Sequence, residues 1–391
     1  MQNDVVIIGG GVIGLSCAFL LGQQGVSITV VDPDLGKGSS WVAAGMLAPV
    51  TESHYGEPDL IELLLAGANE WDGFAQALEG ASDKHIGFEL QGTLLVALDA
   101  SDRLAIDELG KFHQTMGLES YRRSSSECRD LIKGLSPRIR GGLEIPRDYQ
   151  VDNRRLLEAL VVACERLGVS FEKDRCTQIV GKRHDQRERI GSSTQTNKAS
   201  PVSVVLEDGR VLYGQKVLVS AGCGSIDIDG FPDGSLPGVR PVKGHILRLR
   251  ARTDGFAIER TVRVLVRGRS CYLVPRDDGT LVLGATSEEL GFDRRLQVGP
   301  VHSLLDDART IFPGLDEMEI LEISTGFRPG SIDNGPYVGW SELEGVALAT
   351  GHSRNGILLA PITARGVVDL FMGREITGPL VKFRVSRVTQ C

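Results

Sequence analysis

Apolar positions near the N-terminus fall into two short runs separated by a helical stretch. The runs are Val5 to Ile8 and Ser27 to Val31, followed by glycine and by an acid respectively. Continuous apolar runs of this length are typical of buried strands. The pattern therefore predicts a strand, a helix and a second strand parallel to the first.

The turn after the first strand has the spacing G-x-G-x-x-G, at Gly9, Gly11 and Gly14. Glycines here permit a tight turn and bring the backbone close to a pyrophosphate, which would meet the free N–H groups of the helix N-terminus. Asp32 ends the second strand, where a carboxylate accepts hydrogen bonds from ribose hydroxyls and repels a 2′-phosphate. The motif therefore predicts FAD or NAD rather than NADP.

Two hydroxyl side chains, Ser39 and Ser40, then precede a run of very small residues from Ala43 to Gly45. Such a stretch lets backbone amides and serine side chains reach a flat, polar ligand. A capped helix start packed against a sheet is the alternative interpretation.

Helix start signals divide the next part of the chain. A single amphipathic helix is predicted from Pro58, with its apolar residues on one face. Further helices are predicted from a cap at Ser101, from the capping box of Ser124 and Glu127, and from a cap at Asp152. The strands predicted around these helices are 88–90, 93–97 and 169–171.

Period-two alternation dominates between Val239 and Glu322, and predicts an antiparallel sheet with one covered face. Before it, a hairpin turn at Asp208 and Gly209 leads to a strand ending at Ala221 and Gly222, which allows close approach of the same dinucleotide. The strands predicted in the alternating region are 245–250, 261–266, 271–274 and 281–284.

Near the C-terminus, the strand 346–350 is followed by the turn GHSRNG at 351–356 and by an apolar helix predicted from Ile357. The positive end of that helix suits a group that gains negative charge, as a reduced flavin does.

Composition narrows the function classes. The chain has 391 residues, 41% of them apolar, and 43 Lys and Arg against 51 Asp and Glu. This acidic balance excludes nucleic acid as a partner, unless the Arg-rich region near 240–270 forms one basic face.

The long apolar window is the glycine motif itself, so no membrane span is expected. The first basic residue is Lys37, which argues against a signal peptide.

The seven cysteines are odd in number and are never spaced as CxxC. We interpret them as small buried apolar residues in a reducing cytoplasm, with no role in metal binding or disulfides.

Six motifs occur in the order and spacing of one family: GGGVIG, SSWVAAGMLAP, CYLVPR, LVLGAT, GFRPGSIDNGPYVG and GHSRNGILLAP. The chain resembles the FAD-dependent D-amino acid oxidase superfamily, and within it the glycine oxidase (ThiO) branch of thiamine biosynthesis. The resemblance covers nearly the whole chain except 181–200. That polar stretch, with one large apolar side chain, is predicted to be a surface insertion.

The resemblance implies an α/β (α+β overall) fold of two domains. A Rossmann-type FAD-binding domain would comprise 1–86, 150–238 and 323–391. A substrate domain with a large mixed or antiparallel sheet would comprise 87–149 and 239–322. It also implies a homo-oligomer, a homotetramer in the family.

Noncovalent FAD is implied, because Gly326 and Phe327 stand where the sarcosine oxidase branch has its flavin-linking cysteine. The implied nucleotide contacts are Gly9, Gly11, Val12, Ile13, Gly14, Asp32, Pro33, Thr177 and Gly222. The implied flavin contacts are Ser39, Ser40, Ala44, Gly45, Met46, His352, Ser353, Arg354, Asn355, Gly356, Ile357 and Leu358.

The resemblance implies that Arg328 binds the substrate carboxylate and that Tyr272 assists it, with Arg354 and Met46 also at the substrate. Arg supplies a planar fork for a carboxylate that Lys could not. A surface turn and simple strand packing are the alternatives for Arg328 and Tyr272.

The sequence departs from the family pattern at three positions, which leaves the identity of the preferred amine open. Thr177 stands where the family usually has an aliphatic residue in contact with the adenine, Ser270 stands where close relatives have a histidine, and Ser287 stands where they have a methionine. The leading hypothesis is oxidation of glycine, sarcosine and small D-amino acids by O2, with formation of H2O2. The imine would supply thiazole synthesis and could pass to thiazole synthase. A D-amino acid oxidase or quinone-linked dehydrogenase with a larger pocket is the rival, and an inactive FAD-stabilised scaffold is a third reading.

Overall fold

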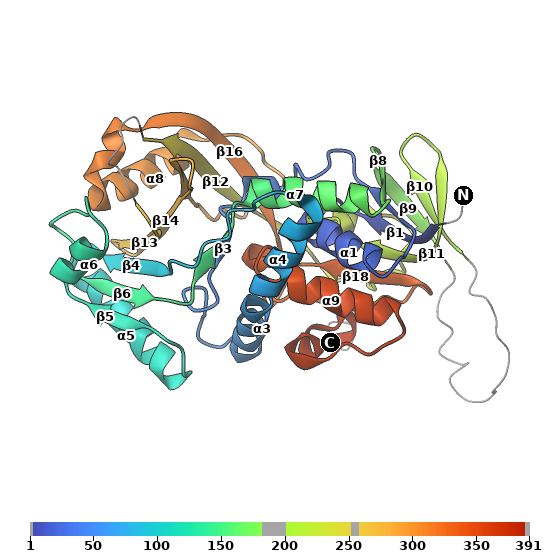
Figure 1. The fold of residues 1–391 in the computed structure, drawn as a ribbon, viewed down its shortest axis with the longest axis horizontal. Coiled ribbons are helices and arrows are strands. Elements are labelled where there is room, and N and C mark those ends of the chain that lie inside the picture. The colour runs from blue at the N-terminus through green and yellow to red at the C-terminus, as the bar shows by residue number, and fades with distance from the viewer. Residues whose placement is uncertain (1–2, 182–200, 252–257, 388–391) are drawn as a thin grey trace.

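The computed structural model describes residues 3–181, 201–251 and 258–387. Two large sheets lie side by side along the long axis of the molecule (Figure 1). The first sheet contains β1 and lies on the right of the view, and the second contains β4 and lies on the left.

The first sheet has the order β17-β18-β11-β1-β2-β8, with the β9–β10 hairpin attached to β11. The pairs β1–β2, β1–β11, β2–β8 and β11–β18 are parallel, which confirms the predicted βαβ start. Its strands are β1 (Asn3–Ile8), β2 (Ile28–Val31), β8 (Ser170–Glu172), β9 (Cys176–Val180), β10 (Val202–Leu206), β11 (Val211–Val219), β17 (Tyr337–Trp340) and β18 (Val346–Thr350).

Helices cover this sheet and share one apolar core with it. That core contains buried residues of β1 and β2 together with those of α1, α7 and α9. The helices of this part are α1 (Val12–Gly22), α2 (Ser39–Val42), α3 (Pro58–Asn69), α4 (Trp71–Ser82), α7 (Asn153–Arg166) and α9 (Ala360–Phe371). The 3-10 helices are η2 (Gly222–Asp227), η4 (Ser353–Asn355), η5 (Gly378–Phe383) and η6 (Val385–Arg387).

The second sheet has the order β16-β12-β15-β14-β13-β4-β6-β5 and is mixed, because β13 and β4 are parallel. Its strands are β4 (Thr93–Ala97), β5 (Tyr121–Arg123), β6 (Gly142–Ile145), β12 (Arg240–Arg250), β13 (Thr261–Val266), β14 (Arg269–Pro275), β15 (Thr280–Gly284) and β16 (Glu319–Gly330). A small sheet of β3 (Met46–Leu47) and β7 (Tyr149–Gln150) lies apart from both. Pairing of β16 with β12 extends to Gly330, past the sequence-based boundary at 322.

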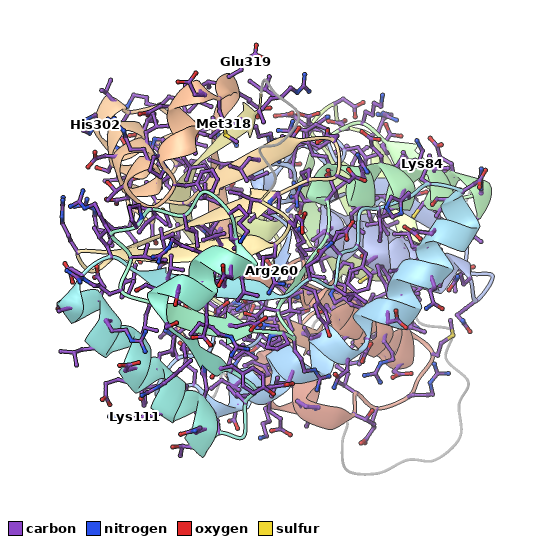
Figure 2. All side chains as sticks on the ribbon, turned by 60° about the vertical axis from the view of Figure 1, so that its left-hand side comes forward. Lys84, Lys111, Arg260, His302, Met318 and Glu319 are labelled. Carbon is purple, nitrogen blue, oxygen red and sulfur yellow. The ribbon has the colours of Figure 1, made fainter. Side chains whose placement is uncertain are left out.

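The two faces of the second sheet pack against different helices. Leu94 and Val96 face a core with α6 (Ser125–Leu131) and α8 (Val298–Ile311), whereas Leu95 and Ala97 face a core with α5 (Ala100–Thr115). Figure 2 shows α8 with His302 and α5 with Lys111 on opposite sides of the sheet. The short η3 (Pro313–Glu317) follows α8.

Four local predictions are wrong. The helix predicted from Pro58 is broken at Glu70, where the chain turns so that buried Trp71 can donate its indole N–H to the carbonyl of Leu358 (2.9 Å). Residues 88–90 form one isolated bridge at Glu89 instead of a strand. The cap of α5 is Asp99, not Ser101, because the Asp99 carboxylate accepts the N–H of Asp102. The C-terminal helix begins at Ala360 and not at Ile357.

The alternating region also contains α8, which sequence periodicity did not predict. The caps at Ser124 and Asp152 are confirmed. Apart from Gly181, the predicted insertion 181–200 lies outside the described residues. Within the described ranges, none of the helices is long and apolar enough to cross a bilayer.

Four arginines of the 240–270 region form ion pairs with carboxylates. The pairs are Arg240–Glu289, Arg260–Glu144, Arg263–Glu52 and Arg269–Asp307. Six cysteines are buried free thiols, as predicted, and Cys391 lies outside the described part of the chain. Burial raises the pKa of the Cys128 thiol to about 11.

The turn into α1 generates a prediction about stability. A methyl group on Gly14 would lie 1.9 Å from the carbonyl oxygen of Gly9, whereas one on Gly80, exposed in α4, would meet nothing within 4 Å. We expect Gly14→Ala to destabilise the protein by about 2 kcal/mol through overpacking. Gly80→Ala, the control, should stabilise it by about 0.5–1 kcal/mol through helix propensity. Denaturant unfolding checks both, and equal stabilities would contradict the packing described here.

Candidate functional site

The glycine turn forms a cradle lined by backbone. Gly9 has φ +103°, and a methyl group there would lie 2.6 Å from the carbonyl oxygen of Ser220 at the end of β11. A methyl group on Gly14 would likewise clash with the backbone carbonyl of Gly9. The start of α1 and the ends of β1 and β11 therefore meet with no room for side chains, which suits a phosphate bound by backbone N–H groups.

The Asp32 carboxylate points at this turn from the end of β2. It accepts the N–H of Gly10 (2.6 Å) and the N–H of Asp34 (2.8 Å). The acid that the spacing predicts to bind the ribose therefore lies beside the glycines.

Residues 39–46 connect the glycine turn to the second sheet. Ser40 Oγ accepts the N–H of Val12 (3.1 Å), and Ser39 Oγ donates to the carbonyl of Phe327 in β16 (2.5 Å). Gly45 has φ +77°, and a side chain there would meet the carbonyl of Val151 at 1.9 Å. The predicted flavin-binding segment therefore lies between the predicted phosphate cradle and the strand that carries Arg328.

The turn before α9 presents free backbone donors. Among the described residues, the N–H groups of Gly356, Ile357 and Leu358 have no acceptor, and neither does the buried side-chain amide nitrogen of Asn355. His352 is buried and its Nε2 contacts Thr363 Oγ1 (3.0 Å). Burial lowers the pKa of this imidazole to about 3, so it is neutral. Donors are thus available although the helix starts later than predicted.

Three further predicted contacts lie at the edges of this region. Thr177 lies in β9 and donates its hydroxyl to the carbonyl of Val205 (3.3 Å). Gly222 begins η2, and its carbonyl accepts the hydroxyl of Thr350 (3.2 Å). Pro33 follows Asp32 directly. Within the described ranges, no hydrogen bond joins Thr177 to the glycine turn.

Arg328 and Tyr272 lie together on the second sheet. Arg328 Nη1 donates to the carbonyl of Thr286 (3.0 Å), and a methyl group on Gly244 would lie 2.7 Å from that nitrogen. Burial raises the pKa of the Tyr272 hydroxyl, while Arg328 and Arg263 oppose the rise. The hydroxyl is therefore protonated at neutral pH and able to donate.

Sequence reasoning missed an ionic cluster beside Tyr272. Glu52 forms very short ion pairs with both Arg263 and Arg354, and Arg263 is paired with Tyr272 across β13 and β14. Burial raises the pKa of Glu52, but the two guanidinium groups outweigh it and hold the pKa at about 2. Asp148 accepts the N–H groups of Val50 and Thr51 (both 2.9 Å), and burial raises its pKa to about 6.

Strand alternation could have identified part of this cluster. Arg263 lies on the face of a predicted strand opposite the buried Val262 and Val264, and Glu52 is an acid a few residues after the predicted flavin-binding segment. Their pairing depends on a contact between distant segments that periodicity does not encode. Arg354, predicted at the substrate, forms an ion pair with Glu52.

The chain matches the family described as FAD dependent oxidoreductase over residues 4–370. It belongs to this family. The bifunctional protein ThiO/ThiG of Synechocystis sp. is 32% identical over 97% of this chain and 53% of its own length, so the chain spans about half the length of that relative. Glycine oxidase of Geobacillus kaustophilus is 28% identical over 99% of this chain and 97% of the relative.

Solved structures agree with this family assignment. The crystal structure of glycine oxidase from Geobacillus kaustophilus superimposes with a TM-score of 0.85 over 99% of both chains, at 28% identity. Iminodiacetate oxidase from Chelativorans sp. BNC1 has a TM-score of 0.82 over 97% of this chain and 98% of its own, and at 23% identity it shows the fold alone. The predicted two-sheet α/β fold is confirmed, and the cofactor of the family is FAD. The glycine cradle, Asp32 and the free donors at 356–358 fit that cofactor.

The ionic cluster predicts a pH-dependent stability. Glu52→Gln leaves Arg263 and Arg354 without their carboxylate, and we expect a loss of roughly 3 kcal/mol in the free energy of unfolding. Because the folded pKa of Glu52, about 2, lies below its ordinary value of 4.5, this stabilisation is complete above pH 4.5. It should shrink as the pH falls towards 2.

Glu289→Gln is the matched control, because Glu289 forms an exposed pair with Arg240. It should change stability by less than about 1 kcal/mol at any pH. Chemical denaturation at several pH values measures both variants. A constant difference between the wild type and Glu52→Gln from pH 7 to pH 3 would contradict the ionised state assigned to Glu52.

Proposed function

We propose that this protein oxidises glycine and small amines such as sarcosine and small D-amino acids to the imine, with O2 as electron acceptor and H2O2 as product. The observation that carries the proposal is the free charge of Arg328. Arg263 and Arg354 are paired with Glu52, whereas Arg328 has no carboxylate partner among the described residues. The likeness to glycine oxidases over nearly the whole chain supports the same substrate class.

Arg328 would bind the substrate carboxylate through its planar guanidinium, and the Tyr272 hydroxyl would donate to the same group. The guanidinium of Arg328 lies against Gly244, where any side chain would clash with it. FAD, when bound, supplies the hydride acceptor for oxidation at the substrate Cα. The protein's part is then to hold the substrate in one orientation and to keep water out. We nominate no general base, because a substrate bound as the neutral amine requires none.

Residues 9–14 and 32 would hold the dinucleotide, residues 39–46 would lie along the flavin, and the free N–H groups of 356–358 would face its pyrimidine edge. Two features support this arrangement. Ser39 and Ser40 tie the flavin segment both to Val12 at the cradle and to Phe327 beside Arg328. The donors at 356–358 lack acceptors and suit developing negative charge.

Thiazole synthesis for thiamine is the proposed use of the product imine. Its support is the relative named bifunctional protein ThiO/ThiG, which this chain matches over about half of that protein's length. We further propose a homo-oligomer, handover of the imine to a thiazole synthase, and a cytoplasmic location in keeping with the buried free thiols. Gel filtration, and pull-down with the synthase, test the first two.

An assay panel tests the substrate class. Purified yellow protein would be offered glycine, sarcosine, D-alanine and D-proline, with peroxide detection. Peroxide from glycine and sarcosine supports the proposal. Turnover of the larger D-amino acids alone favours the rival D-amino acid oxidase, and turnover only with a quinone acceptor favours the dehydrogenase.

Arg328→Ala should raise the KM for glycine steeply while FAD remains bound, because it removes a charge-assisted pair worth about 2–5 kcal/mol. Arg328→Lys should recover only part of the loss, since Lys lacks the planar fork. Steady-state kinetics with flavin content measured in parallel checks this. A wild-type KM in the alanine variant would assign the substrate carboxylate to another residue.

Sulfite binding reports on the proposed flavin environment. The N–H groups at 356–358 should stabilise negative charge on the flavin, so the oxidised protein should form a sulfite adduct and, on photoreduction, the red anionic semiquinone. Visible spectra during titration measure both. If the protein does not bind sulfite at millimolar concentration and forms only the blue neutral semiquinone, this placement of the turn is contradicted.

A further inference from the structure

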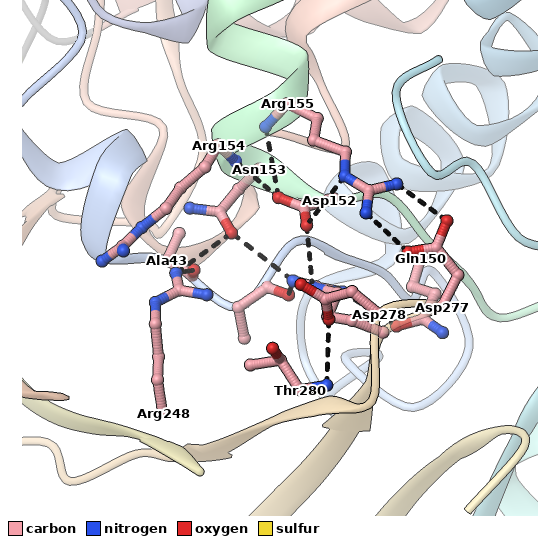
Figure 3. A network of polar contacts seen from close by, with 12 residues as sticks. Ala43, Gln150, Asp152, Asn153, Arg154, Arg155, Arg248, Asp277, Asp278 and Thr280 are labelled. Carbon is pink, nitrogen blue, oxygen red and sulfur yellow. Dashed lines mark hydrogen bonds and ion pairs between the residues drawn. The ribbon is translucent and has the colours of Figure 1, made fainter. Parts of the chain in front are cut away.

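Three arginines donate to backbone carbonyls of residues 41–44, and two of them, Arg154 and Arg248, are labelled in Figure 3. Arg154 comes from α7, Arg248 from β12 and Arg276 from the loop after β14. Sequence reasoning assigned none of them a role. In Figure 3, Arg248 and the neighbouring Asn153 point toward one another beside Ala43.

The arginines and Asn153 bind carbonyl groups of this segment. The carbonyl of Trp41 accepts from Asn153 Nδ2 (2.8 Å) and from Arg248 Nη2 (3.3 Å). The same Nη2 lies 3.4 Å from the carbonyl of Ala43, and Arg276 Nη2 donates to the carbonyl of Ala44 (2.5 Å). These carbonyl groups are therefore turned toward the arginines.

Asn153 connects the two more deeply buried arginines. Its side-chain oxygen accepts from Arg248 Nη2 (3.3 Å) and from Arg276 Nη2 (3.4 Å), while its Nδ2 donates to the carbonyls of Ser40 and Trp41 (both 2.8 Å). The amide thus has one orientation that satisfies both partners. It couples the second sheet to the segment that precedes Gly45.

Arg248 is in an electrostatically unfavourable place. Its exposed fraction is 6%, its Nε has no acceptor, and no carboxylate lies within ion-pair distance among the described residues. Burial and the nearby charges of Arg154 and Arg276 lower its pKa to about 10. Arg154 and Arg276, by contrast, have Glu322 and Asp152 as ionic partners. A buried charge of this kind costs stability relative to an apolar residue, which suggests a role other than stability.

We propose that Arg248, oriented by Asn153, is a positioning residue for the flavin. It holds the carbonyls of Trp41 and Ala43 on the side away from the cofactor, and its charge favours the anionic reduced flavin. The proposal rests on the placement of residues 39–46 along the flavin. Arg is suited to this task because one planar guanidinium reaches two carbonyls and an amide while it remains charged.

The test compares substitutions of Arg248 in the FAD-loaded protein. Arg248→Met removes the charge and the donors, Arg248→Gln removes the charge but keeps a donor, and Arg248→Lys keeps the charge. Arg250→Met is the control, because Arg250 is the exposed last residue of the same strand. For each we would measure bound FAD, the visible spectrum, the dissociation constant for sulfite and the two-electron reduction potential.

We expect the Met and Gln variants to retain FAD but to bind sulfite about tenfold more weakly. The reason is that each variant removes one positive charge from a site that is partly shielded from water. A tenfold loss in the reduction equilibrium would lower the two-electron potential by about 30 mV. The Lys variant should stay within about threefold of the wild type, since a charge remains. The Arg250→Met control should match the wild type.

Wild-type sulfite affinity and potential in either neutral variant would overturn this proposal. If both neutral variants lose FAD, Asn153→Asp is tested in their place. A carboxylate beside Arg248 should weaken sulfite binding. Unchanged sulfite affinity in Asn153→Asp would again overturn the proposal. Failure of the wild-type protein itself to bind sulfite is a different result. That outcome contradicts the proposed flavin site and not the role of Arg248 alone.

Discussion

The backbone of residues 39–46 is held from two sides, and the arrangement of the site depends on it. Ser40 binds the first turn of α1, and Ser39 binds the carbonyl of Phe327 in β16. Arg248 and Arg276 bind its carbonyls from the second sheet. Because these partners lie on α1, which packs on the first sheet, and on the second sheet, a shift of either part would move this segment. The distance between the glycine cradle and Arg328 is therefore fixed through one short stretch of chain.

Period-two geometry places the groups of the second sheet. Gly244 lies beneath Arg328, and Tyr272 lies opposite Arg263, so strand pairing brings them to one face. On that face Glu52 neutralises one of the two charges of Arg263 and Arg354. Arg328 donates to the backbone carbonyl of Thr286 and has no carboxylate partner among the described residues. An unpaired guanidinium beside a protonated tyrosine suits an anionic substrate group.

Sequence alone predicted the features that local patterns encode. The glycine turn, Asp32 and the strands of the alternating region follow from spacing and periodicity, and they occur where expected. The ion pairs of Glu52 and the network around Arg248 were not predicted, because each joins segments distant in sequence. The break at Glu70 was missed for the same reason, since it follows from the contact between Trp71 and Leu358.

The central claim is that this chain uses Arg328 and Tyr272 to present glycine to a bound FAD. The most direct measurement is anaerobic mixing of the purified yellow protein with glycine, followed by admission of air. The account predicts that glycine bleaches the flavin spectrum without O2, and that air restores it with release of H2O2. A flavin that stays oxidised with glycine and sarcosine, yet is reduced by dithionite, would contradict the account.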